Sequence, residues 1–92
     1  MKKHPTRVEG FDGSLQTLAQ RILRMRYDKA VKFIGFCVSE IDRQAEGDRG
    51  RGRPKLAAKL EQAAQAAEVF EQKMQEVFDL CTPFMKDELK DD

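Results

Sequence analysis

The stretch GDRGRGRPK, residues 47–55, separates two segments that are rich in Ala, Gln, Glu, Lys and Leu, the composition of helices. Its three glycines allow a sharp turn. Pro54 suits the first position of a new helix, because its missing N–H is not needed there. Upstream, Ser14 is a suitable N-cap. We therefore expect one long helix over 14–46, a linker over 47–53 and a second long helix over 54–81.

The remaining residues of this 92-residue chain complete a single domain over 14–90. Residues 1–13 contain Pro5, Gly10 and Gly13, and we expect a flexible lead-in there. Pro83 cannot continue the second helix, so a short terminal helix is expected over 83–89. An alternative breaks the first helix near Tyr27-Asp28, with Asp28 capping the second part.

Apolar residues recur along the second helix at alternating spacings of four and three, which is typical of a seam that faces a partner helix. They are Leu56, Leu60, Ala63, Ala67, Phe70, Met74, Val77, Cys81 and Phe84. Folding the chain back at the linker brings this seam against the first helix, with Phe70 near Ala30. The fold class is therefore all-α, an antiparallel hairpin of two long helices with a short C-terminal turn.

The first helix has two apolar lines on opposite faces. One line comprises Leu23, Tyr27, Ala30, Ile34, Cys37 and Ile41. The other comprises Leu15, Leu18, Ile22, Met25, Phe33 and Phe36. One hairpin partner covers a single face, so the second line is our candidate interface.

An exposed apolar strip of this size is unusual for a monomer. We expect a second copy to cover it, giving a homodimer with the architecture of a four-helix bundle. Two alternatives remain open: a monomeric three-helix fold in which residues 14–27 pack back, and obligate binding to a different protein.

The charge is distributed unevenly along the chain, although its net value is only +1. Residues 1–55 carry 13 Lys and Arg against 7 Asp and Glu, a net +6, whereas residues 56–92 carry 4 against 9, a net −5. We expect the two halves to lie side by side with opposite charges facing each other.

The string Arg51-Gly52-Arg53-Pro54, followed by Lys55, resembles the core of the AT-hook, a short DNA-binding motif. The resemblance covers five residues. It implies that Arg51 and Arg53 insert into the minor groove of A·T-rich DNA, while Gly52 allows close approach of the backbone and Lys55 contacts a phosphate. A tight turn between helices needs the same residues, and we favour the turn.

The sequence contains no recognisable catalytic motif or cofactor-binding motif. His4 has no partner at metal-ligand spacing, so no metal is expected, and Cys37 and Cys81 are interpreted as buried free thiols. Glu40 and its acidic neighbours are interpreted as an ion-pair network. The longest uncharged run, 33–39, is too short to span a membrane. We expect a cytoplasmic, non-enzymatic helical adaptor or regulatory protein with an unidentified protein partner; the alternative is a small DNA-associated protein.

Overall fold

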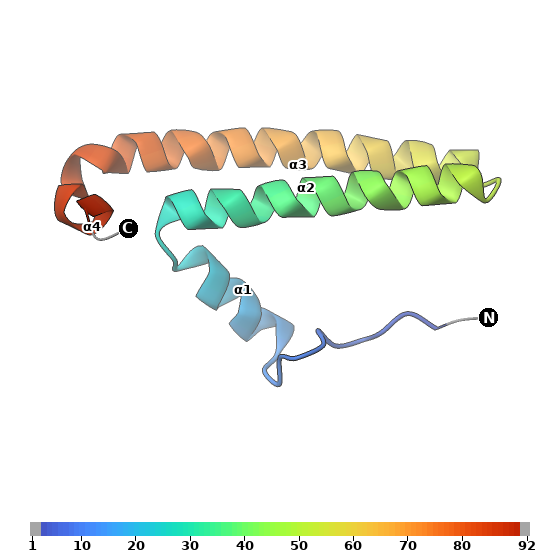
Figure 1. Ribbon diagram of the computed structural model, residues 1–92, viewed down its shortest axis with the longest axis horizontal. Coiled ribbons are helices and arrows are strands. Elements are labelled where there is room, and N and C mark those ends of the chain that lie inside the picture. Colours follow the sequence, from blue (N-terminus) through green and yellow to red (C-terminus); the bar gives the residue numbers. More distant parts are fainter. Residues whose placement is uncertain (1–2, 91–92) are drawn as a thin grey trace.

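The computed structural model describes residues 3–90, and side chains as far as residue 89. Its elements are α1 (Leu15–Leu23), α2 (Tyr27–Gly50), α3 (Pro54–Cys81), a short 3-10 helix η1 (Thr82–Phe84) and α4 (Lys86–Lys90). Every regular element in this range is helical, which confirms the predicted all-α class, and two of the helices are long. Figure 1 shows α2 and α3 side by side, with the chain reversing direction between them.

The reversal occupies only Arg51–Arg53, whereas the sequence predicted a linker over 47–53. Helix α2 continues to Gly50 because main-chain hydrogen bonds close its end: the Arg51 N–H donates to the Gly47 carbonyl at 3.1 Å, and the Arg53 N–H to the Asp48 carbonyl at 2.9 Å. Gly52, with φ +76°, then makes the left-handed turn that glycine tolerates best. The two glycines upstream of it are therefore helical, not part of the loop.

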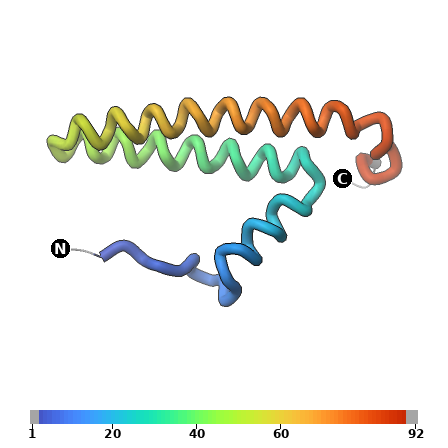
Figure 2. The backbone as a smooth tube through the Cα atoms, turned by 180° about the vertical axis from the view of Figure 1, so that it is seen from behind, coloured from blue at the N-terminus to red at the C-terminus, as the bar shows by residue number. Residues whose placement is uncertain are grey.

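The expected single helix over 14–46 is two helices, interrupted at Arg24–Arg26. Arg26 has an extended backbone, with φ −51° and ψ 137°, which ends helical geometry at this point. The interruption lies just before Tyr27-Asp28, the site of the alternative prediction, and both of these residues belong to the first turn of α2, with Arg26 at the N-cap position. Because of this break, α1 leaves the helix pair at an angle, as the two opposite views show (Figures 1 and 2).

The core lies along the contact between α2 and α3, and its alanines are small enough for the two helices to approach closely. The buried apolar residues are Ala30, Val31, Ile34, Val38 and Ala45 of α2, with Ala57 and Ala64 of α3. The predicted line on α3 is half correct. Five predicted residues are half-buried as expected: Leu60, Ala67, Met74, Val77 and Cys81. Phe84 is instead 89% exposed. Ala57, Ala64 and Glu71 take the places expected for Leu56, Ala63 and Phe70.

The buried positions of α3 are displaced by one residue from the predicted ones because α2 is longer than predicted. The reversal is centred on Gly52, about two residues later than the predicted linker, so the pairing of the helices slides along the chain. Phe70 consequently lies beside Phe33, Ile34 and Cys37 instead of Ala30. Leu56 and Phe70 remain about half exposed on the flank of the helix pair.

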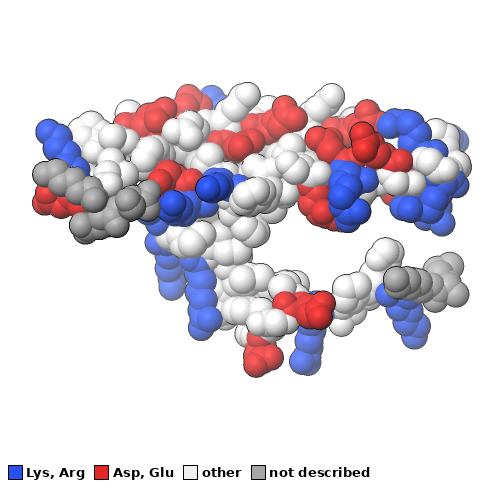
Figure 3. Space-filling model, in the orientation of Figure 1, with Lys and Arg blue, Asp and Glu red and all other residues white. Residues whose placement is uncertain are grey.

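We expected opposite charges of the two halves to face each other. One described ion pair joins the two long helices in this way, between Arg49 of α2 and Glu61 of α3. Arg43–Glu40 and Lys73–Glu76 join residues of the same helix, and Asp28 and Asp48 pair with arginines close to them in the sequence. Figure 3 shows Lys and Arg gathered around the junction of α1 with α2 and at the turn, and Asp and Glu along α3. Basic and acidic residues are therefore concentrated in different parts of the molecule, and most of the described ion pairs join residues that are close in the sequence.

Candidate functional site

An apolar groove of about 200 Å³ lies where α1 diverges from α2 and α3. It is lined by Ala19, Ile22 and Leu23 of α1, Phe33, Ile34 and Cys37 of α2, and Ala67 and Phe70 of α3. The lining offers no carboxylate, amide or hydroxyl group to orient a polar ligand. A groove of this kind is suited to the apolar side of another helix.

Arg26 is the last residue of the interruption between α1 and α2, and its side chain is only 15% exposed. Its guanidinium donates two hydrogen bonds to the Asp28 carboxylate, Nε to Oδ1 at 2.6 Å and Nη2 to Oδ2 at 2.8 Å. A third bond runs from Nη1 to the main-chain oxygen of Glu88 in α4, at 3.2 Å. The hydrogen bonds from Arg26 lower the pKa of Asp28 below its ordinary value. This set of contacts, the Arg26 clamp, links the α1–α2 junction to the C-terminal helix.

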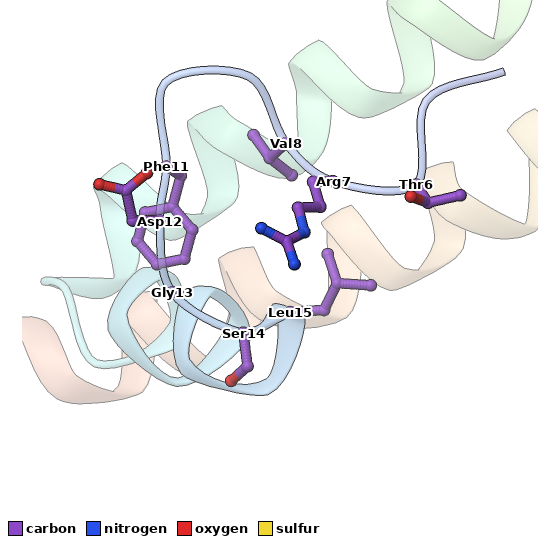
Figure 4. Close-up of a pocket in the computed structure, with 8 residues that line it drawn as sticks. All are labelled: Thr6, Arg7, Val8, Phe11, Asp12, Gly13, Ser14 and Leu15. Atoms are coloured by element: carbon purple, nitrogen blue, oxygen red, sulfur yellow. The ribbon is translucent and has the colours of Figure 1, made fainter.

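The start of α1 is fixed by local contacts. The Ser14 hydroxyl accepts the Thr17 N–H at 3.1 Å, which confirms the predicted N-cap. The Phe11 ring folds back toward α1, where the Arg21 guanidinium lies 5.7 Å from its centre. Figure 4 shows this segment, residues 6–15, curled around a hollow of about 290 Å³. The hollow is formed by one short stretch of chain and is separate from the apolar groove.

The structure divides the predicted interface residues among several places. Ile22 and Phe33 line the groove. Leu15 and Phe36 are the most exposed of the set, at 66% and 64%, and Met25 is exposed close to the junction, whereas Leu18 is half-buried. Sequence reasoning assigned five groove residues to the contact between the long helices: Leu23, Ile34, Cys37, Ala67 and Phe70. One signal in the sequence could have indicated a second apolar line on α3. It is the seven-residue repeat formed by Leu56, Ala63 and Phe70.

The linker residues lie at the turn between α2 and α3. None of them lines the groove. Arg51 Nη2 lies 3.2 Å and Arg53 Nη1 3.4 Å from Oδ1 of the buried Asp48. The Arg51 side chain also folds over Gly47, where a Cβ would lie 3.0 Å from its Nη2. Both arginines therefore stabilise the turn, and DNA binding by Arg51, Gly52, Arg53 and Lys55 stays a prediction.

The titratable residues elsewhere form ordinary surface pairs. Arg43 donates to both carboxylate oxygens of Glu40, at 3.0 and 2.5 Å, and together with Gln44 it lowers the pKa of Glu40 to about 2. That carboxylate stays ionised near neutral pH. Cys37 and Cys81 are free and half-buried. Among residues 3–90, no group of three or more His, Cys, Asp or Glu is placed to hold a metal ion.

No helix in the described part of the chain combines the length and apolar character that crossing a bilayer requires. Comparisons of the chain with models of protein families, with curated proteins and with solved structures found no match. The groove and the exposed side chains around it are thus the features on which a function can be argued.

Proposed function

We propose that this protein is a non-enzymatic helical adaptor or regulatory protein that binds other protein surfaces and self-associates. In this proposal α2 and α3 form a rigid antiparallel hairpin, and the apolar residues of α1 and α2 form the interface. The observation that supports it is the open apolar groove between α1 and the helix pair, together with Phe36 of α2, which is 64% exposed and does not line the groove.

The amount of exposed apolar surface supports a protein partner. Taking about 200 Å² for a large side chain, the exposed fractions leave roughly 600 Å² of side-chain surface in water on six residues: Leu15, Leu23, Met25, Phe33, Phe36 and Phe70. A standard interface buries about 800 Å² on each partner, of which somewhat more than half is apolar. The exposed surface is therefore large enough for a stable protein interface.

The groove chemistry argues for association over catalysis. A catalytic site needs a nucleophile, an acid or a base placed in a cavity, and the groove lining has none beyond the Cys37 thiol. The linker arginines are bonded to Asp48, which favours a role in the turn over one in DNA binding.

Light scattering coupled to size-exclusion chromatography tests the proposal. We expect a mass of about twice the 10.6 kDa of the chain. Phe36→Asp should shift the mass toward that of one chain while helicity by circular dichroism persists, because Phe36 lies outside the α2–α3 core.

Val69→Asp is the matched control, since Val69 is 54% exposed on α3 and does not line the groove. It should leave the mass unchanged. A wild-type protein that stays at the mass of one chain at every concentration would remove self-association from the proposal.

A further inference from the structure

We infer that the groove is filled by helix α1 of a second copy, so that two chains pair reciprocally with their α1 helices antiparallel. This inference rests on the self-association proposed above and adds its geometry. The shared interface consists of the apolar face of α1, centred on Ala19, together with the groove walls at Phe33 and Phe70.

The groove stays open in the single chain, although Ala19, Ile22 and Leu23 of α1 form one of its walls. The Arg26 clamp ties the residue just before α2 to Asp28 and to the Glu88 carbonyl, and α1 diverges from the helix pair on the other side of this residue. Leu15, at the far end of α1, is two-thirds exposed. Both the groove and the ridge beside it remain available to another molecule.

The surface around α1 contains both a ridge and a groove, and a two-fold symmetric contact requires such a self-complementary surface. The ridge is formed by Leu15 and Leu18 on α1, and the hollow is the groove beside Ile22 and Phe33. Ala19 is the middle residue of α1 and its small side chain faces the groove. Two α1 helices that cross antiparallel at Ala19 therefore place the ridge of each chain in the groove of the other.

The charges of the α1 region fit this antiparallel arrangement. Residues 15–20 carry no charge, while Arg21 and Arg24 lie at the opposite end of the helix. Antiparallel pairing keeps the arginines of the two copies apart, and it brings Arg24 of each chain toward Asp12, which precedes α1 in the partner. Both Arg24 and Asp12 are exposed in the single chain. Leu15, Leu23, Phe33 and Phe70 leave roughly 400 Å² of apolar surface exposed on each chain, about half of the 800 Å² that a standard interface buries on each partner.

Disulfide trapping tests the crossing point. In a Cys37→Ser/Cys81→Ser background, Ala19→Cys should give a covalent dimer on mild oxidation, because the two-fold axis brings the two thiols together. Val69→Cys in the same background is the control and should remain largely monomeric on a non-reducing gel.

Two further variants test the contacts on either side of Ala19. Leu15→Asp should abolish the Ala19→Cys cross-link and shift the mass to one chain, while circular dichroism remains that of the wild type because Leu15 is exposed. Arg24→Glu should weaken the dimer about tenfold, since two symmetric pairs are each worth a few-fold in affinity. Adding Asp12→Arg to Arg24→Glu should restore most of the loss.

The outcomes separate this inference from the proposed function. A dimer by light scattering that gives no Ala19→Cys cross-link and tolerates Leu15→Asp would overturn the α1 pairing but keep self-association. A single-chain mass for the wild type at all concentrations would overturn both.

Discussion

Replacing Phe36 with alanine should weaken self-association strongly while leaving the fold of the single chain nearly unchanged. Phe36 is 64% exposed. Full burial of a phenylalanine covers about 200 Å², so about 130 Å² remains for a partner to cover. At about 25 cal/mol per Å², covering half of this on each of two chains contributes about 3 kcal/mol. Since about 1.4 kcal/mol is a factor of ten, the dimer Kd should rise about 100-fold.

The assay is sedimentation velocity over a dilution series, which gives the Kd of the wild type and of Phe36→Ala under the same conditions. Chemical denaturation at the lowest concentration should differ between them by less than about 0.5 kcal/mol, the range of surface substitutions. Val69→Ala is the control of similar exposure and should leave the Kd unchanged. An equal Kd for wild type and Phe36→Ala, or an equal shift for both variants, would refute the reasoning.

Three further predictions concern the core, the α1–α2 junction and the turn. Ile34→Ala removes a side chain that is 5% exposed, and should lower the free energy of unfolding by about 2–5 kcal/mol in a denaturant titration. The pKa of Asp28 is lowered in the folded chain, so its contribution to stability is present above the ordinary pKa and should fade as the pH falls below about 4. Asp28→Asn should flatten that part of the stability–pH curve, and a profile identical to wild type would contradict the clamp. Arg51→Ala/Arg53→Ala should lower the free energy of unfolding by less than about 1 kcal/mol, because both side chains are about 60% exposed. The same variant tests DNA binding in a titration with an A·T-rich duplex at two salt concentrations. Equally weak binding by variant and wild type would exclude the AT-hook, whereas loss of binding in the variant alone would support it.

The secondary structure was largely predictable because its signals are local. The Ser14 hydroxyl needs only the amide of Thr17 to cap α1. Pro54 begins α3 because its ring presets φ, and Pro83 lies just beyond the end of α3 at Cys81. The all-α class follows from the same short-range preferences.

The candidate site was only partly predictable, because it depends on how distant segments meet. Ile22 and Phe33 were singled out from the pattern of α1 and α2, and both line the groove. Phe70 was missed because it was assigned to the contact between the long helices. Its true position depends on where the chain reverses, and a shift of the turn by two residues changes which side of α3 is buried.

By itself the sequence determined that this chain is helical, that a turn lies within residues 47–53, and that its N-terminal half has more apolar surface than one helix can cover. Tertiary structure alone decided which of these apolar residues line the groove and which are exposed elsewhere. The Arg26 guanidinium bonds across the fold to Glu88, 62 residues later, and so ties the start of α2 to the C-terminal helix. No local pattern encodes such a contact, because its two partners are remote in the sequence and meet only when the chain folds.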